Sequence, residues 1–352
     1  MKILYYTFVI IFLLLHIGCN QEDGIFPRKN AKILFLSQRI ENKAEWNLFS
    51  MNNDGTEQRK IIDLSVRCDK PVVSHSGKKV LFVHNTDDFY SELYSANVDG
   101  TYLTLIDRAK RYCGSADWSY DDEKIVYSKS RNESTDDKDI ILFDVSEGTK
   151  KALITMGNNT LGKFSRNNLI AYCHQRDDAS YDIYVMNMDG SNNRKIITKA
   201  MCPVWSPDGK RIAYQSSISN GSSQIFVAAN DGTNQNQLTS TFSSRFWPGW
   251  PPDGNYDPQW TPDGKMIVYV SWEDEDPEIY SMNSDGSNKT KLTNTDKRDE
   301  NPEITSDGKF ILFSSRRNMG MGTEIFIMNL NGKNQRPLSN YSRSDIYPVE
   351  IR

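Results

Sequence analysis

The sequence has few of the residues on which metal and catalytic sites depend. Its 352 residues include five cysteines and four histidines. Neither a Cys-x-x-Cys pair nor a Cys-His spacing typical of zinc ligands occurs, so we expect no metal site. Gly-x-Ser-x-Gly and Gly-rich phosphate-binding motifs are missing as well, which removes common signatures of hydrolases and nucleotide-binding proteins. The sequence therefore predicts no catalytic centre and no cofactor.

An excess of positive charge is also missing. The chain has 42 Lys and Arg against 46 Asp and Glu, a net charge of −4 at pH 7. Lys2 is the one charged residue among residues 1–18, so the rest of the chain carries about −5 (−4 minus 1). Proteins that bind nucleic acid through its phosphates need a basic surface. We therefore expect no nucleic-acid partner.

A hydrophobic run long enough for a confident membrane span is not present. The apolar stretch from Ile3 to Leu15 falls short of the ~20 residues that a span needs. Together with Lys2 before it and the small residue Gly18 after it, the stretch predicts a secretory signal peptide over residues 1–18. A tethering helix is the alternative.

Cys19 directly follows this segment and resembles the first residue of bacterial lipoproteins, whose cysteine thiol is lipidated. The sequence departs from that pattern because His16 stands where Leu is usual. The resemblance implies a lipid anchor at Cys19, a tether over residues 19–30, and an exported protein on the outer membrane, facing the periplasm or the cell surface. The acidic residues 20–23 resemble a surface-export tag of Bacteroidetes-type lipoproteins. A plain signal peptide with an incidental cysteine is the other interpretation.

Two short phrases recur through the remainder of the chain. The first is fullest at residues 203–210 (Pro-Val-Trp-Ser-Pro-Asp-Gly-Lys), and the second at residues 279–286 (Ile-Tyr-Ser-Met-Asn-Ser-Asp-Gly). Periods of roughly 20–50 residues indicate solenoids or propellers. The final glycine of the second phrase recurs at intervals of 45, 48, 42, 42, 54 and 46 residues, the differences between Gly55, Gly100, Gly148, Gly190, Gly232, Gly286 and Gly332.

Each repeat predicts four short antiparallel strands. Residues 266–270 and 278–283 are rich in β-branched and aromatic residues, as buried strands are. Pro-Asp-Gly at 262–264 and Asp-Gly at 285–286 are turn sequences, in which Asp accepts local backbone hydrogen bonds. The same order recurs at 71–106, 114–155, 160–198, 201–239 and 299–339, although the third and fourth repeats lack the Pro-Asp-Gly sequence.

The first repeat lacks its first strand. It begins at Lys32–Leu36, which corresponds to the second strand of the other repeats. The chain ends with Tyr347–Ile351, which resembles the first strand Asn301–Ile304 of the seventh repeat. We expect this C-terminal strand to complete blade one, which leaves no open sheet edges. Residues 31–352 are thus predicted to form a seven-bladed β-propeller of four-stranded antiparallel blades.

The two phrases together resemble the TolB-type, WD-like β-propeller repeat. TolB itself carries an α/β domain before six blades, so the likeness is to the repeat family and not to TolB proper. Related propellers cover the catalytic domain of prolyl oligopeptidases, or hold a metal through clustered histidines in oligogalacturonate lyases. The sequence shows neither a hydrolase domain nor such a cluster, because His75, His84 and His174 are predicted to lie apart.

Other positions have expected structural roles. Trp118, Trp205 and Trp260 occupy equivalent inner-strand positions and should wedge between blades. The remaining cysteines are expected to be buried free thiols, with a Cys68–Cys113 disulfide as the alternative that an oxidising compartment permits. These cysteines are Cys68, Cys113, Cys173 and Cys202.

The candidate ligand site lies on the top face, where the first strand of each blade begins and the loops vary. Variable loops on a rigid scaffold commonly carry function. The longest of them, 240–257, places aromatics near the acidic run 273–278, which is either a solvated loop or a calcium site. The candidate ligand-binding residues are Trp247, Trp250, Tyr256 and Trp272.

Two functions are consistent with these features. If the four aromatics are exposed, they suit stacking on a sugar ring or gripping a peptide; the alternative is a cap that packs on itself. We therefore expect a monomeric, non-catalytic cell-envelope lipoprotein whose top face binds a protein or glycan partner. The other reading is a polysaccharide-active lyase or hydrolase with acidic residues in the channel.

Overall fold

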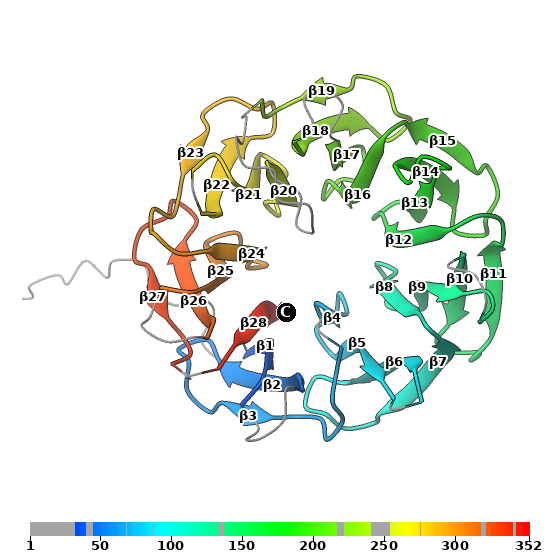
Figure 1. Cartoon of the computed structure of the whole chain (residues 1–352), viewed down its shortest axis with the longest axis horizontal. Helices are drawn as coiled ribbons and strands as arrows, with labels where there is room; N and C mark the ends of the chain where they lie inside the picture. Colours follow the sequence, from blue (N-terminus) through cyan, green and yellow to red (C-terminus); the bar gives the residue numbers. More distant parts are fainter. Residues whose placement is uncertain are drawn as a thin grey trace, which may run out of the picture.

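The protein folds into a ring of seven β-sheets around a central channel (Figure 1). The computed structural model describes residues 32–39, 45–67, 69–86, 88–133, 137–216, 222–240, 254–274, 276–317, 322–340 and 343–352. Each sheet has four antiparallel strands, which confirms the predicted seven-bladed propeller. The part of the chain described in these ranges contains no helix long and apolar enough to cross a membrane.

The strands of each blade run outward from the channel in a constant order, except that blade one begins with the last strand of the chain. Blade one contains β28 (Asp345–Ile351), β1 (Lys32–Ser37), β2 (Asn47–Asn52) and β3 (Arg59–Lys60). Blade two contains β4 (Val72–Val73), β5 (Lys79–Asn85), β6 (Tyr90–Asn97) and β7 (Thr104–Lys110). Blade three contains β8 (Cys113–Trp118), β9 (Lys124–Ser130), β10 (Lys138–Asp144) and β11 (Lys150–Ile154).

The other four blades follow the regular order without exchange of strands. Blade four contains β12 (Asn159–Phe164), β13 (Leu169–Gln175), β14 (Tyr181–Asn187) and β15 (Arg194–Ile197). Blade five contains β16 (Ala200–Trp205), β17 (Arg211–Ser216), β18 (Gln224–Ala229) and β19 (Asn236–Gln237). Blade six contains β20 (Asn255–Trp260), β21 (Met266–Ser271), β22 (Glu278–Asn283) and β23 (Thr290–Lys291). Blade seven contains β24 (Asp299–Ile304), β25 (Phe310–Ser315), β26 (Glu324–Asn329) and β27 (Arg336–Pro337).

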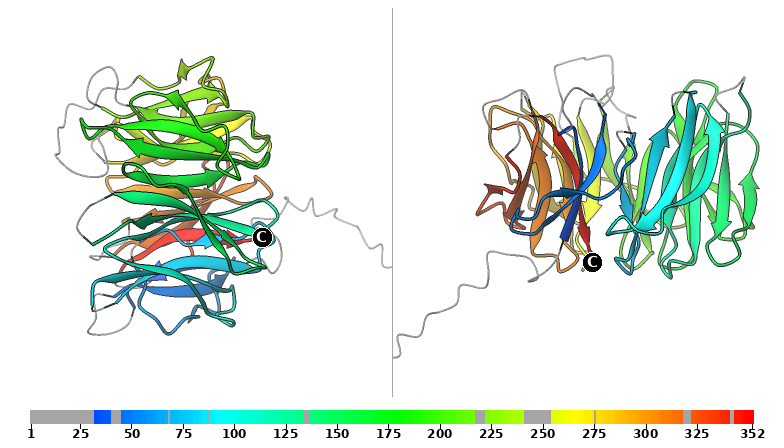
Figure 2. Two further views of the ribbon diagram at one scale, coloured as in Figure 1. Left: turned by 90° about the vertical axis from the view of Figure 1, so that its right-hand side faces the viewer. Right: turned by 90° about the horizontal axis from the view of Figure 1, so that it is seen from below.

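The ring closes through the pairing of β28 with β1, as the sequence predicted. Lys32 pairs with Ile351 and Ser37 with Asp345, so the C-terminal strand becomes the inner strand of blade one. The chain then ends against blade two, because a Cβ atom on Gly77 would lie 2.1 Å from the carbonyl oxygen of Arg352. Figures 1 and 2 show this end of the chain beside the channel, on the bottom face.

The hydrophobic core lies between neighbouring blades. One cluster, for example, joins Ile225 and Val227 of blade five to Ile267 and Met282 of blade six. Three tryptophans connect the inner strands as predicted, because each indole N–H donates a hydrogen bond to a carbonyl of the preceding blade. The pairs are Trp118 with Val72 (3.2 Å), Trp205 with Lys163 (3.0 Å) and Trp260 with Val204 (3.1 Å).

The bottom turns are built by the predicted Asp-Gly chemistry. Asp208 accepts hydrogen bonds from the Ser206 hydroxyl (2.6 Å) and the Lys210 amide (3.0 Å). The glycine of the second phrase has a further role, because it touches the neighbouring blade. Gly100 has φ +92°, and a Cβ atom there would lie 1.9 Å from the Ile61 carbonyl oxygen of blade one. Only glycine satisfies both requirements.

A β-bulge interrupts the inner strand of most blades. In blade five the pairing with β17 shifts register between Met201 and Val204, so the residues between them leave the ladder. A bulge re-aims a side chain, and here it turns the third residue of the strand towards the channel. This residue has φ between 49° and 56° at Ser115, Leu161, Cys202, Asp257, Asn301 and Tyr347. Lys70, two residues before Val72 on β4, is the corresponding residue of blade two.

Candidate binding site in the central channel

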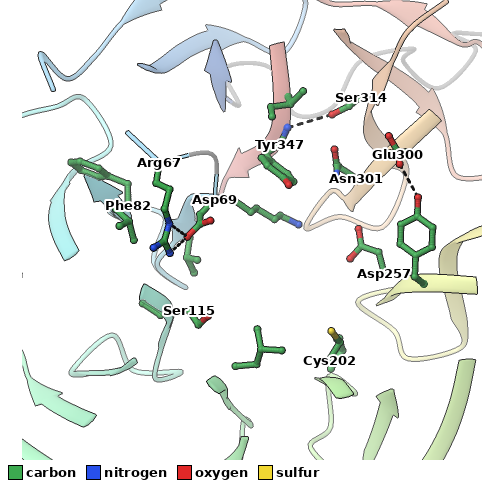
Figure 3. A pocket seen from close by; sticks show the side chains of 18 of the residues that line it. Arg67, Asp69, Phe82, Ser115, Cys202, Asp257, Glu300, Asn301, Ser314 and Tyr347 are labelled. Atoms are coloured by element: carbon green, nitrogen blue, oxygen red, sulfur yellow. Dashed lines mark hydrogen bonds and ion pairs between the residues drawn. The ribbon is translucent and has the colours of Figure 1, made fainter. Parts of the chain in front are cut away.

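The central channel contains a cavity of about 890 Å³, within the range typical of ligand sites. The residues at this position line it, one from each of the seven blades, and we call them the channel ring. Figure 3 labels five of them, namely Ser115, Cys202, Asp257, Asn301 and Tyr347. The ring has two chemically different sides. Blades four and five contribute Leu161 and Cys202, whereas blades six, one and two contribute Asp257, Tyr347 and Lys70. A ligand in the channel therefore meets a small apolar wall and an ionisable wall.

Lys70 links blades two and seven across the ionisable wall. Its Nζ donates a hydrogen bond to Glu303 Oε2 at 2.8 Å, and its side chain is 33% exposed to the channel. Burial lowers the pKa of Lys70, but the charges of Glu303 and Asp257 outweigh this and hold the pKa above its usual value. Burial raises the pKa of Asp257, although Lys70 and a hydrogen bond from Gln259 oppose that shift.

Arg67 lies at the top mouth of the channel, on the blade-two side. It forms an ion pair with Asp69 (Figure 3), and its guanidinium lies over the Tyr112 ring at 4.7 Å from the ring centre. Lys138 reaches the same ring, at 5.2 Å. This side of the mouth thus has cations whose charge is matched by a carboxylate and an aromatic face.

Two of the predicted ligand-binding aromatics meet on the opposite side of the mouth, but they are not exposed. Tyr256 and Trp272 each have only 7% of their surface exposed, and they pack together with Val270. Of the two alternatives, exposed platforms do not hold for these two, because residues of blade seven contact them, and their role in ligand binding stays a prediction. The Tyr256 hydroxyl donates to Glu300 at 2.8 Å, and Arg298 lies over the Trp272 ring at 5.1 Å. Trp247 and Trp250 lie outside the described residues.

Tyr256 is part of the channel wall. Burial raises the pKa of Tyr256 well above its usual value, and the charge of Glu300 adds to the shift, so the hydroxyl remains a hydrogen-bond donor. The Trp272 indole lies beside this hydroxyl, yet its buried Nε1 makes no hydrogen bond of normal geometry.

The acidic run 273–278 makes protein contacts at both of its ends. Asp274 accepts hydrogen bonds from Lys291 (2.6 Å) and from the Tyr280 hydroxyl (3.1 Å), and the Lys291 contact lowers the pKa of Asp274. Glu278 is fully buried and accepts from Thr293. Within the described ranges, no three His, Cys, Asp or Glu side chains gather as a metal site would require.

The histidines lie apart, as expected. Nδ1 of His75 contacts Arg352 (3.1 Å) at a bottom turn of blade two. His84 and His174 lie on β5 and β13, where their Nδ1 atoms contact the Ser65 carbonyl (2.5 Å) and Asn159 Oδ1 (2.9 Å). His75 and His84 lie at different places in blade two and His174 lies in blade four, so the three do not assemble a shared catalytic group.

The cysteines that the structure describes are free thiols. Cys113 and Cys173 are buried and Cys202 is half-buried. Burial raises the pKa of both Cys113 and Cys202 to about 12, so neither thiol is activated as a nucleophile. Cys68 lies outside the described residues.

Fold and channel define a seven-bladed β-propeller with a ligand-sized central cavity. Residues 199–349 match the family described as TolB beta propeller domain, which confirms the resemblance over these residues. An uncharacterized protein of Agrobacterium fabrum is 29% identical over 143 residues, which are 41% of this chain and 44% of that protein. The Tol-Pal system protein TolB of Alcanivorax borkumensis is 31% identical over 120 residues, 33% of this chain and 27% of that protein. The chain thus spans less than half of the length of these relatives.

Solved propellers share the fold at low sequence identity. TolB from Acinetobacter baumannii has a TM-score of 0.55 at 17% identity, covering 91% of this chain and 82% of that one. The β-propeller domain of the Trilobed protease from Pyrococcus furiosus reaches 0.68 at 15% identity, with 89% and 99% covered. Oligogalacturonate lyase from Vibrio parahaemolyticus reaches 0.63 at 16% identity, with 85% and 86% covered. These similarities establish the architecture, which both binding proteins and enzymes use.

Proposed function

We propose that this protein is a non-catalytic binding protein of the bacterial cell envelope, whose channel holds a protein or glycan partner through its top mouth. The observation that carries the proposal is the channel ring. Its seven members share one backbone position, yet each has a different side chain, and all of them line one cavity. A position needed only for the fold would be filled alike in each blade, as the Asp-Gly turns are.

The chemistry of the described residues supports binding over catalysis. The histidines are dispersed, and Glu303, the second carboxylate whose charge acts on the channel carboxylate Asp257, is held by its hydrogen bond from Lys70. The relatives named Tol-Pal system protein TolB are named for a protein system and not for a reaction. Both points favour a partner that is held and released unchanged.

The proposed location of the protein at the cell envelope depends on Cys19. We expect its thiol to carry the lipid anchor, with residues 19–30 as the tether between the membrane and blade one. Cys19→Ser should therefore move the protein from the membrane to the soluble fraction. If labelled fatty acid never appears on the wild-type protein, the anchor is excluded, whereas the binding role is judged separately.

The binding role is tested with one photo-crosslinking residue at two positions. Tyr347 belongs to the channel ring, and Tyr120 is a tyrosine exposed at a bottom turn of blade three. p-Benzoylphenylalanine replaces either ring with similar shape. On illumination of intact cells, the Tyr347 variant should give a defined adduct and the Tyr120 variant none.

Two results would contradict the proposal. One is the absence of an adduct at the channel position, or equal adducts at both positions, which would mean that the channel does not select a partner. The other is turnover of a polysaccharide by the purified wild-type protein, which would establish the enzyme reading instead.

A further inference from the structure

Arg298 and Arg316 lie side by side at the top mouth of the channel. Arg298 directly precedes β24, Arg316 directly follows β25, and the Arg316 amide donates to the Arg298 carbonyl at 3.0 Å. This contact extends the register of the pair Asp299 and Ser315, so the two arginines stand opposite each other in the ladder. Side chains of such a pair leave the same face of the sheet, about 5 Å apart at Cβ. Both line the cavity.

Three other blades whose residues at this position are described do not place two like charges there. The same backbone contact joins Ser130 to Tyr112 in blade three, Gln175 to Asn158 in blade four, and Trp272 to Gly254 in blade six. Directly opposed like charges destabilise an antiparallel pair. Blade seven therefore carries an unfavourable arrangement that the fold itself does not require.

Neither arginine of this pair has a direct carboxylate partner among the described residues, unlike the other cations of the channel. The cavity is lined by five cationic side chains and three carboxylates, although the whole chain has a net charge of −4. Three of the cations have carboxylate partners, which are Asp69 for Arg67, Glu303 for Lys70 and Asp117 for Lys163. Neither Arg298 nor Arg316 forms an ion pair with a described carboxylate.

Buried aromatics hold the pair in position. Arg298 stacks over Trp272 at 5.1 Å, and Trp272 is itself 7% exposed, so the guanidinium rests on a fixed surface. The hydroxyl of neighbouring Tyr256 satisfies Glu300 at 2.8 Å. Glu300 is thereby kept as an acceptor for Tyr256, and the Trp272 side chain acts as a positioning residue for Arg298.

We infer that Arg298 and Arg316 bind a carboxylate of an acidic, extended protein segment that enters the channel from the top. The inference rests on the proposed function and names its ligand class. Paired guanidinium groups match carboxylates in geometry and charge. The bulge of blade seven takes Asn301 and its proline neighbour out of the ladder, and the Asn301 amide lines the channel, where it can hydrogen-bond an extended main chain. Tyr256 and Trp272 are buried and offer no face for sugar stacking, so an acidic glycan is the competing ligand in the test.

The test measures binding of labelled peptides to the full-length protein in non-ionic detergent. Fluorescein-labelled hexaglutamate and hexaglutamine are compared by fluorescence anisotropy, with labelled oligogalacturonate as the acidic glycan. Hexaglutamate should bind about tenfold tighter than hexaglutamine, and its affinity should fall as salt is added. Arg316→Gln and Arg298→Gln should each weaken hexaglutamate binding about tenfold, and the hexaglutamine affinity should not change.

Arg194→Gln is the matched control. Arg194 is an exposed arginine on the outer strand of blade four, and its substitution removes the same net charge. Arg316 is also exposed, so its replacement leaves the fold intact, which melting temperature verifies. Equal binding of the two peptides, no binding of either, or an equal loss in Arg194→Gln and Arg316→Gln overturns the inference. Binding of oligogalacturonate without hexaglutamate overturns the protein ligand. If any of these results appears while the Tyr347 crosslink persists, the anion site fails and the proposed function stands.

Discussion

The bottom turns and the channel ring each recur at the same position of every blade. The turns keep nearly the same residues from blade to blade, whereas the ring residues all differ. In five blades the turn Asp accepts the amide of the residue two positions later, at 2.9–3.0 Å, and each turn ends in glycine. The ring carries a different side chain in every blade. In most blades the turn is fixed because its own backbone and the preceding blade leave no alternative to glycine. The ring residue only has to tolerate its bulged backbone, and its side chain faces a cavity.

The largest loss of stability is expected when the strand exchange that closes the ring is removed. Deletion of residues 344–352 takes away β28, leaves β1 without its inner partner, and uncovers Gly77 of blade two. The free energy of unfolding should fall by several kcal/mol, a large share of the ~5–15 kcal/mol typical of a domain. Urea unfolding measures this loss, and an unchanged midpoint would contradict the role of β28.

A single turn glycine should have the next largest effect. Gly100→Ala forces a Cβ atom against the Ile61 carbonyl and a non-glycine residue into φ +92°, so we expect a loss of about 2–4 kcal/mol. Gly148→Ala is the matched control, because φ there is +67° but nothing lies within 4 Å of the added carbon. It should lose only about 1 kcal/mol from backbone strain. Equal losses would show that contact between blades does not constrain the turns.

Two equivalent junctions between blades should differ in how their stability depends on pH. Gln224 of blade five meets Asn255 of blade six at 3.0 Å, whereas the equivalent Glu278 of blade six faces the charge of Asp299 of blade seven. Burial, reinforced by Asp299, raises the pKa of Glu278 from 4.5 to about 7. The folded state therefore binds this proton more tightly than the unfolded chain. Stability should fall by about 3 kcal/mol as pH rises from about 4.5 to 7, since each pKa unit corresponds to about 1.4 kcal/mol, and it should stay lower above that range.

Glu278→Gln copies the neutral junction of blade five. Its melting temperature should change less between pH 5 and pH 8 than that of the wild type, because the substituted side chain does not titrate. Gln224→Glu is the reciprocal variant and should acquire a pH dependence of the same sign. Parallel pH profiles for wild type and Glu278→Gln would exclude Glu278 as the source.

The smallest effect on stability is expected in the channel ring. Leu161→Ser replaces a half-buried side chain at the edge of a core cluster with the residue that Ser115 already provides in the adjacent blade, so the loss should be about 1 kcal/mol. Ile170→Ser, at a fully buried position between blades, should lose about 3 kcal/mol or more. A large loss at Leu161 would mean that the ring serves the fold and not a ligand.

Recurrence made much of the fold predictable. A period is visible without coordinates, and it includes the tryptophans at 118, 205 and 260 and the Asp-Gly turns. The exchanged C-terminal strand was predictable because it resembles the first strand of the other repeats. The channel ring could also have been predicted from the sequence. In five blades its residue stands directly before the proline of the first phrase, as Cys202 and Asp257 do. Arg298 and Arg316 had no such signal, because they belong to no repeated phrase.

The sequence by itself determined the number of blades, the strand order and the closure, because these follow from local turn chemistry and from hydrophobic repeats that each blade carries within about 45 residues. Only the tertiary structure decided which side chains share an environment. Tyr256 and Trp272 are buried because Glu300 and Arg298 of the next blade cover them. Lys70 finds Glu303 across 233 residues because the ring returns blade seven to blades one and two. Burial and charge pairing of these side chains depend on contacts between adjacent blades, and those contacts exist only once the ring has closed.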